Sequence, residues 1–431
     1  MNEFEKIIGY KDIKTELIRL CDVIKNPKKY KDLGVTPING LLLDGDPGVG
    51  KTLMAKCFIK ECGRKSFICH KDKPNGEFVK EIKNVFTKAV EQAPSIILLD
   101  DMDKFANEDN YHRNTDEYVT IQSCIDEIKG KDVFVIATTN GIGDLPESLL
   151  RKGRFDTIID IETPKDDDAI EIVKYYLSQK KTIAEINAET VARLLNGQSC
   201  ATLEAVINIA GQYAGYENKE MIDMDDIIRA CLRVIYNAPE SSTPHNPIVL
   251  ERLSYHEAGH TVVSEILENG SVDLVSVRTN TSEVIGGFTS FHTSDDYLIS
   301  KKLMENRVIA LLAGKAATEI VFGEVDTGSN NDLHRAFKIV ENFCDDYCSY
   351  GFGSWTERNS SNSLIARKED RVIADMENYY TKAKKIIIEN RIFLDEIAKR
   401  LQEKDTIVSS EIKKIKEYTT KKREKLNTIN S

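Results

Sequence analysis

Short apolar runs alternate with amphipathic stretches over the N-terminal part of the chain. Residues 40–44, 95–100 and 133–137 are almost wholly apolar, which is typical of strands buried on both faces of a sheet. The stretches between these runs carry polar and apolar residues at helical spacing. This alternation predicts an α/β domain with a parallel sheet over residues 1–163.

The pattern becomes helical further along the chain. Apolar residues at helical spacing predict a small helical domain over residues 164–237. A polar, proline-bearing stretch then predicts a linker at residues 238–247. Residues 248–431 are predicted to form a third domain, which is mostly α-helical and has one strand-like insertion at 272–291.

The charge of the chain excludes one class of partner. The 431 residues include 59 Lys and Arg against 70 Asp and Glu, so the formal net charge is −11. A nucleic-acid-binding surface needs a basic face, and we therefore expect no nucleic-acid partner. The basic run at 421–425 is the exception, and we interpret it as a solvated helix end.

The nine cysteines are scattered and lack paired C-x-x-C spacing, which predicts buried free thiols in a reducing compartment. The N-terminus has no signal pattern, and no apolar run is long enough to cross a bilayer. We therefore expect a soluble cytoplasmic protein without a transmembrane segment.

Residues 45–52 match the nucleotide-binding loop G-x-x-x-x-G-K-[ST], between a predicted strand and a predicted helix. The glycines let backbone amides turn toward phosphates, and the helix N-terminus favours negative charge. Lys51 would reach the outer phosphates, while Thr52 and Asp100 would hold magnesium. The predicted ATP-binding residues are Gly45, Asp46, Pro47, Gly48, Val49, Gly50, Lys51, Thr52 and Asp100.

A second motif, H-E-x-x-H, begins at His256. Two histidines four residues apart on a helix face one side, so His256 and His260 could bind one zinc ion. Glu257 beside them could take a proton from zinc-bound water. The site needs a third ligand, and by residue type Asp332, His334 and Glu319 are candidates. Asp332 and His334 point in roughly opposite directions on one helix, so both cannot bind the same ion.

Four segments resemble the AAA+ ATPases in order and spacing: residues 45–52, the strand ending in Asp100 and Asp101, residues 137–140 and residues 149–156. The resemblance implies a helical lid at 164–237, a sensor at Asn140 and a water-polarising carboxylate at Asp101. It also implies that Arg151 and Arg154 are arginine fingers, which reach the nucleotide of a neighbouring subunit. Fingers that act in trans imply a ring, which in the family is a hexamer.

Residues 197–203 are similar to a segment of FtsH-type proteases, which join an AAA+ module to a C-terminal zinc peptidase. The resemblance runs from Phe4 to about Ile412. It implies that Asp332 is the third zinc ligand and that Glu319 lies near the ligands without being one. Most FtsH proteins have membrane helices before the ATPase, and we expect that this chain lacks them because it begins where the ATPase begins.

Two positions depart from the family pattern. Asp101 stands where the family usually has Glu, and its shorter side chain predicts slow ATP hydrolysis. Between residues 66 and 86 the aromatic-glycine loop that grips substrate in the ring pore is missing, and Phe78 is a candidate to replace it.

Residues 286–291 predict a strand near the zinc site, which could either bind a peptide as an added strand or be a plain core strand. Together these patterns predict a ring-forming, ATP-dependent zinc endopeptidase that resembles FtsH. Its expected cofactors are one zinc per subunit, ATP and magnesium, and its expected partners are protein or peptide substrates and further copies of itself. The alternative is a nucleotide-switched remodelling or scaffold protein with weak or uncoupled protease activity, which Asp101 and the missing pore loop favour.

Overall fold

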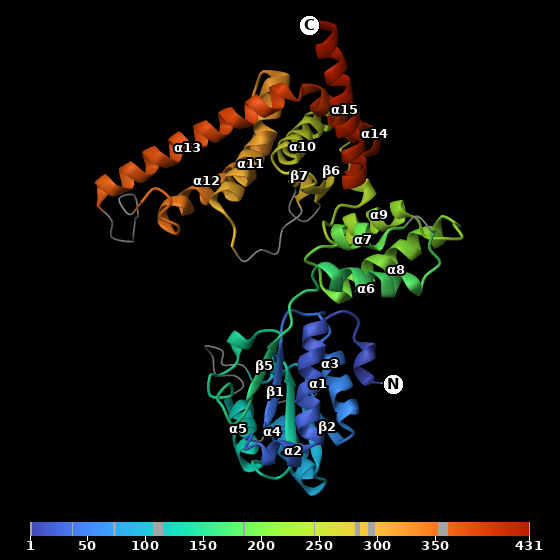
Figure 1. Cartoon of the computed structure of the whole chain (residues 1–431), viewed down its shortest axis with the longest axis vertical. Coiled ribbons are helices and arrows are strands. Elements are labelled where there is room, and N and C mark those ends of the chain that lie inside the picture. Colours follow the sequence, from blue (N-terminus) through green and yellow to red (C-terminus); the bar gives the residue numbers. More distant parts are fainter. Residues whose placement is uncertain are drawn as a thin grey trace. The chain divides into compact units, whose positions relative to one another are not determined.

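The computed structural model describes residues 2–36, 38–71, 75–106, 115–183, 186–244, 246–280, 285–291, 298–351 and 361–430. The chain divides into two units, Met1–Ile227 and Ile228–Ser431, and the division falls within helix α9, Met224–Val234. Figure 1 labels most helices and several strands of both units.

A parallel five-stranded sheet forms the centre of the first unit, with strand order β2-β3-β4-β1-β5. Its strands are β1 (Gly40–Asp44), β2 (Lys65–Cys69), β3 (Ser95–Leu99), β4 (Val133–Thr138) and β5 (Thr157–Asp160). Every residue of β3 and β4 is buried, because helices cover both faces of the sheet. The predicted α/β class with a parallel sheet is confirmed, and β2 and β5 are strands that the apolar runs did not indicate.

Helices α4 and α5 lie on one face of the sheet and helices α1 and α3 on the other (Figure 1). The bounds of these helices, with the short α2 that follows α1, are α1 (Lys11–Lys25), α2 (Pro27–Asp32), α3 (Lys51–Cys62), α4 (Asn75–Glu91) and α5 (Thr115–Glu127). Short 3-10 turns occur at η1 (Glu3–Lys6), η2 (Met102–Lys104) and η3 (Ile142–Asp144).

The hypothesis that Phe78 grips substrate is wrong. Its side chain is 0% exposed and packs edge-to-face on Phe105, with ring centroids 5.1 Å apart. Residues 77–86 belong to one continuous helix, α4, so no loop interrupts the chain between Lys80 and Ile82. Residues 72–74, which also belong to the predicted pore-loop region, lie outside the described residues. Phe78 is a core residue because α4 must bury one face against the sheet.

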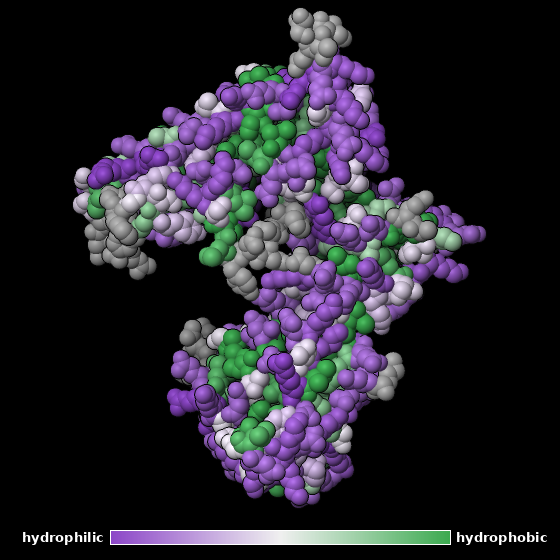
Figure 2. Space-filling model, in the orientation of Figure 1, coloured by the Kyte–Doolittle hydropathy of each residue, from purple (hydrophilic) through white to green (hydrophobic). Residues whose placement is uncertain are grey.

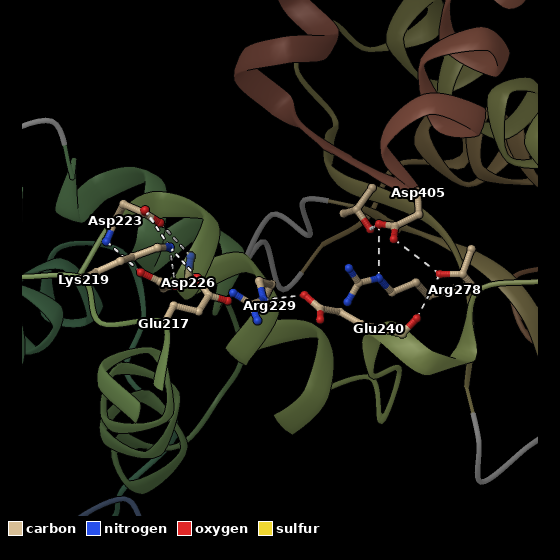
Figure 3. A network of polar contacts seen from close by, with 10 residues as sticks. Glu217, Lys219, Asp223, Asp226, Arg229, Glu240, Arg278 and Asp405 are labelled. Carbon is tan, nitrogen blue, oxygen red and sulfur yellow. Dashed lines mark hydrogen bonds and ion pairs between the residues drawn. The ribbon is translucent and has the colours of Figure 1, made fainter. Parts of the chain in front are cut away.

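The rest of the first unit is helical, with α6 (Asp166–Ser178), α7 (Ala188–Leu194), α8 (Cys200–Tyr216) and the start of α9. The turn between α8 and α9 is held by Lys219, whose Nζ donates to Asp223 and to the buried Asp226, each at 2.9 Å (Figure 3). A carboxylate of Glu217 lies 3.1 Å from the same ammonium group. The buried carboxylate of Asp226 needs a cation partner, and its pairing with Lys219 fixes where α9 begins.

The second unit packs helices around a small antiparallel sheet of order β7-β6-β8. Its elements are the turn η4 (Glu240–Ser242), α10 (Pro247–Leu267), β6 (Val272–Asn280), β7 (Ile285–Phe291), α11 (Lys301–Phe322), η5 (Thr327–Ser329), α12 (Asn330–Asp345), α13 (Asn362–Glu389), α14 (Arg391–Lys404), β8 (Thr406–Val408) and α15 (Ser409–Asn430). The predicted insertion at 272–291 is a pair of strands, and β8 joins it from a distant part of the chain. The mostly helical character of this region is as predicted.

A buried ion pair joins β6 to the turn before β8. The side chain of Arg278 is 6% exposed, and its Nε lies 3.1 Å from an Asp405 carboxylate oxygen (Figure 3). The backbone N–H of Val277 donates to the Asp405 carbonyl over 2.8 Å. These contacts align β8 with β6.

The outer surfaces of the C-terminal helices are polar. In the view of Figure 2, α14 and α15 present mostly hydrophilic residues. Among the described residues, no helix combines the length and the apolar character that a membrane span requires.

Candidate nucleotide and zinc sites

The nucleotide-binding loop connects β1 to α3, as its chemistry requires. Gly48 and Gly50 have φ values of 84° and 104°, a region that favours glycine, and α3 begins directly after them. Lys51 is buried, and its Nζ donates to the carbonyls of Gly45 and Asp46 over 2.6 and 2.7 Å. Burial lowers the pKa of the Lys51 ammonium group. A phosphate at the N-terminus of α3 would meet this cation and the backbone amides of the loop.

Thr52 and Asp100 share a hydrogen bond, although 48 residues separate them in the chain. The Thr52 hydroxyl donates to Asp100 Oδ1 over 2.9 Å, and the Thr138 hydroxyl donates to the same oxygen over 2.9 Å. Asp100 follows β3, Thr138 is the last residue of β4, and Thr52 lies in the helix that follows β1. These three strands are neighbours in the sheet. A hydroxyl and a carboxylate at this edge are oxygen ligands suited to magnesium.

Asp101 and Asn140 line the same cavity as Lys51, and each has a partner nearby. Asp101 has a left-handed backbone, with φ 54°, and its carboxylate forms an ion pair with Lys104. The Asn140 amide nitrogen donates to Asp103 over 3.2 Å. The structure therefore brings the two predicted water-handling residues together, with Asp101 paired to a cation.

The two predicted arginine fingers differ in their surroundings. Arg154 donates to Asp126 over 2.7 Å and to the Ser148 carbonyl, and this hydrogen bond with Arg154 lowers the pKa of Asp126 to about 2. Arg151 is exposed, and its side chain makes no hydrogen bond or ion pair within the described part of the chain. Of the two, Arg151 is the one whose side chain is available to another molecule.

The nucleotide cavity has a second side that the sequence motifs did not identify. The cavity measures about 670 Å³ and is lined on this side by the N-terminal segment and by helices α6 and α8. The lining residues on this side include Ile7, Ile8, Tyr10, Ile172, Tyr176, Cys200 and Ala201. The backbone N–H of Ala201, in the segment that resembles FtsH, donates to the Gly48 carbonyl over 3.0 Å. This apolar side could enclose a nucleotide base. In the sequence, the one sign of such an apolar surface is the pair Ile7 and Ile8 before the first helix.

The histidine motif and the downstream aspartate meet in the second unit. His256 and His260 lie on α10, and Asp332 lies in the first turn of α12. Asp332 Oδ2 is 3.3 Å from the Nε2 atom of each histidine, and the two Nε2 atoms are 3.0 Å apart. The ligand atoms of the three residues all lie within 4.8 Å of one another. Two imidazoles and one carboxylate at this spacing suit a catalytic zinc site with an open position.

The backbone of α11 orients His260 and lies close against both imidazole rings. The His260 Nδ1–H donates to the carbonyl of Ala310 over 2.8 Å, which leaves Nε2 free to bind a metal. A Cβ at Gly314 would lie 2.5 Å from His256 Cε1 and from His260 Nε2, so only glycine leaves room for the rings. Burial lowers the pKa of His260, but Asp332 outweighs burial and the pKa rises to about 9. Metal binding at this site would therefore displace a proton.

Glu257 is buried beside the metal-binding group. The Thr289 hydroxyl of β7 donates to its carboxylate over 2.8 Å, and burial raises the pKa of Glu257. A Cβ at Gly287 would lie 2.7 Å from Glu257 Oε1, so glycine lets the strand approach. Strand β7 is at the edge of its sheet and lines a cleft of about 260 Å³ that contains both histidines.

Tyr236 is a further residue of this cleft that the sequence analysis missed. Its ring stacks on Phe288 of β7, with centroids 4.4 Å apart, and its hydroxyl donates to Ser290 over 2.9 Å. Tyr236 lies two residues after the end of α9, in a stretch without a recognisable motif, so no sequence signal identified it.

The two rival zinc ligands have other surroundings. His334 is exposed on α12 and does not belong to the metal-binding group. Glu319 accepts hydrogen bonds from Lys384, over 2.6 Å, and from Tyr380. The hydrogen bond from Lys384 is the main reason that the pKa of Glu319 falls to about 2. Glu319 is therefore not a member of the metal-binding group, and a lysine and a tyrosine of α13 hold its carboxylate.

Comparison with known proteins identifies both halves of the chain. The sequence model of the ATPase family associated with various cellular activities (AAA) matches residues 41–163, and that of peptidase family M41 matches residues 250–415. The ATP-dependent zinc metalloprotease FtsH 2 of Thermoanaerobacter sp. (strain X514) is 32% identical over 95% of this chain and 82% of the relative. The chain belongs to the FtsH family. The FtsH of Thermotoga maritima is 30% identical over 96% of this chain and 72% of the relative.

A third FtsH relative, FtsH 1 of Phytoplasma mali, is 28% identical over 97% of this chain and 71% of the relative. The predicted FtsH family is thus confirmed, together with the order of an AAA ATPase followed by a helical zinc peptidase. The comparisons give no support to the alternative of a remodelling or scaffold protein.

The zinc site generates a first prediction. Asp332→Asn should bind zinc far more weakly, because a negatively charged ligand is lost. The loss of affinity should exceed the roughly 10–100-fold that results when a hydrogen-bond partner of a ligand is removed. Glu319→Gln should keep full zinc content, since Lys384 and Tyr380 hold that carboxylate. Metal analysis after dialysis measures both, and zinc loss from Glu319→Gln with retention in Asp332→Asn would reverse the assignment.

The nucleotide site generates a second prediction. Asp101→Glu should raise ATP turnover severalfold, because the longer side chain reaches further toward the attacking water. Lys104→Ala should raise it less, since it frees the Asp101 carboxylate without lengthening the side chain. Phosphate release measures turnover, with Asp101→Asn as the inactive control. Turnover that stays level or falls in Asp101→Glu would mean that the site has adapted to the shorter side chain.

Proposed function

We propose that this FtsH-family chain is an ATP-dependent zinc endopeptidase whose peptidase site consists of His256, His260, Asp332 and Glu257. The observation that carries the proposal is the convergence of three ligand side chains within 4.8 Å, with a buried carboxylate next to them on α10. The cofactors are one zinc ion per subunit, together with ATP and magnesium at the loop of residues 45–52.

His256, His260 and Asp332 would hold the zinc, which lowers the pKa of a bound water and polarises the substrate carbonyl. Glu257 takes the proton of the attacking water and returns it to the leaving amine. The hydrogen bond from Thr289 fixes the Glu257 carboxylate for this task. Burial, which raises the pKa of Glu257, makes that carboxylate a stronger base than an exposed one. Strand β7 binds the substrate backbone as an added edge strand, which holds the scissile bond above Glu257.

The ATPase site uses the residues around the loop. Lys51 neutralises the outer phosphates, while Thr52 and Asp100 hold magnesium. Asp101 accepts a hydrogen bond from the attacking water, and Asn140 orients that water. Arg151 completes the site of a neighbouring subunit, which makes the active form a ring of identical chains, in our proposal a hexamer. Arg154 supports this edge of the subunit through Asp126.

We assign residues 1–163 to the ATPase core, 164–237 to its lid, 238–247 to a linker and 248–431 to the peptidase domain. The substrates are proteins or peptides, and the net charge of −11 disfavours nucleic acid. We place the protein in the cytoplasm, because its scattered cysteines lack the spacing of a disulfide framework.

The peptidase proposal is tested by Glu257→Gln, which removes the base and keeps both histidines. Cleavage of an unstructured peptide should fall by about 100-fold or more, while zinc content stays at one per subunit. Peptide cleavage is followed by fluorescence and zinc by metal analysis. Cleavage by Glu257→Gln at the rate of the unchanged protein would refute the assignment of the base.

Coupling to ATP is tested with two substrates, an unfolded peptide and a stably folded protein. We expect the peptide to be cut at similar rates with ATP and with a non-hydrolysable analogue, because the peptidase site needs only an extended backbone. The folded protein should be cut poorly, since α4 is continuous through residues 77–86 and Phe78 is buried. Efficient ATP-driven degradation of the folded protein would show that other residues pull the substrate.

A further inference from the structure

A second cavity of about 260 Å³ lies beside the zinc cleft in the peptidase unit. It is formed by α10, β7, α11 and α12, which lie together in Figure 1. Phe291, Leu311 and Arg335 line both this cavity and the zinc cleft. Ala310, whose carbonyl orients His260, also lines it. A substrate side chain that leaves the backbone next to the scissile bond could therefore enter this cavity.

The walls of the cavity are largely apolar. They are formed by Leu267, Phe291, Leu303, Leu311 and Ile339, together with Ala310. Binding pockets for specific ligands typically combine such walls with a few placed polar groups. The walls therefore suit a large side chain with an apolar body.

Three polar residues of the cavity have an unmet hydrogen-bonding need. Ser264 Oγ, Ser271 Oγ and Asn306 Oδ1 are buried oxygens without a hydrogen-bond partner among the described residues, and Ser264 is only 6% exposed. A buried polar atom without a partner is costly, so a ligand that supplies one gains affinity. An amide oxygen such as Asn306 Oδ1 can only accept a hydrogen bond, so the ligand must donate one.

The charges around the cavity narrow the choice of donor. Arg307 and Arg335 line it, and neither forms an ion pair within the described part of the chain, while Glu268 is exposed at the same cavity. Two guanidinium groups against one carboxylate repel a lysine or arginine side chain. An aspartate or glutamate side chain would suit the arginines but cannot donate to Asn306. A neutral donor on an apolar body, the phenol of tyrosine, satisfies both conditions.

We propose that this cavity is a specificity subsite that binds a tyrosine side chain next to the scissile bond, with Asn306 as the acceptor of the phenol hydrogen bond. The proposal rests on the proposed peptidase function. Ser264 and Ser271 complete the polar end of the subsite, and the apolar walls hold the ring.

The test uses the full chain with zinc and a peptide library that varies the residues on each side of the cleaved bond. Tyrosine should be preferred at one position, where its kcat/KM should exceed that of phenylalanine by about tenfold, the effect of one buried hydrogen bond. Asn306→Leu keeps the size of the side chain and removes the acceptor, so it should bring the ratio to one or below. Ser264→Ala should reduce the ratio less.

The matched control is Asn378→Leu, the same substitution at an exposed position of α13, which should keep the ratio. Because the readout is a ratio within one protein sample, partial misfolding of a variant does not change it. Equal cleavage of the two peptides by the unchanged protein, or an unaltered ratio in Asn306→Leu, would overturn the subsite. A preference for glutamate at this position would do so too, since it would mean that the arginines select the side chain.

A binding measurement separates failure of the subsite from failure of the peptidase proposal. Glu257→Gln keeps both histidines, and its affinity for fluorescent tyrosine and phenylalanine peptides should show the same tenfold ratio by anisotropy. If the unchanged protein cleaves nothing, or if Glu257→Gln still cleaves, the peptidase proposal fails while this affinity ratio still decides the subsite. Equal affinities with Glu257-dependent cleavage would refute the subsite alone.

Discussion

The close packing of α10 against α11 is the contact on which the peptidase unit depends. A Cβ at Gly259 would lie 2.5 Å from the Ala313 carbonyl oxygen, and one at Gly314 would overlap both imidazoles. The helices can approach this far only because both positions are glycine. The same approach brings the Ala310 carbonyl to His260, so the backbone of one helix orients a candidate metal ligand of the other. A larger residue at either glycine would separate the helices and move the histidines away from Asp332.

The nucleotide unit depends in a similar way on the order of its strands. Strands β3, β4 and β1 are consecutive neighbours, so the residues at their carboxyl ends meet at one edge of the sheet. Asp100 and Thr138 follow from this order directly, and Thr52 joins them from the first turn of α3. The shared carboxylate oxygen is therefore a consequence of sheet topology, although the three residues are far apart in the chain.

Much of this could be predicted from the sequence because local patterns specify it. Alternating apolar runs predicted the α/β class, and the two motifs identified the loop before α3 and the histidines of α10. What the sequence could not predict depends on contacts between distant segments. The apolar side of the nucleotide cavity combines Ile8, Tyr176 and Cys200, none of which belongs to a motif that describes a pocket.

Contacts between distant segments also explain other differences between the sequence patterns and the structure. Phe78 looked available because its motif precedes a loop in the family, but an amphipathic helix buries its apolar face, and that residue is in the core. Arg151 and Arg154 look equivalent in sequence, yet among the described residues only the Arg154 side chain pairs with a carboxylate, that of Asp126. Strand β8 has only three residues, too few to show an alternating pattern of apolar and polar positions. It forms because its backbone pairs with the edge of β6.

The two sites differ in how far their own chain prepares them for chemistry. In the peptidase site the supporting contacts hold the reacting groups in place, since Ala310 orients His260 and Thr289 fixes Glu257. In the nucleotide site the supporting contacts occupy the reacting groups, since Lys104 pairs with Asp101 and Asp103 binds Asn140. Those contacts must be exchanged for a water and a phosphate before ATP can react. Preorganised groups lose no free energy to such an exchange, so the contacts of Lys104 and Asp103 add a cost that those of Ala310 and Thr289 do not.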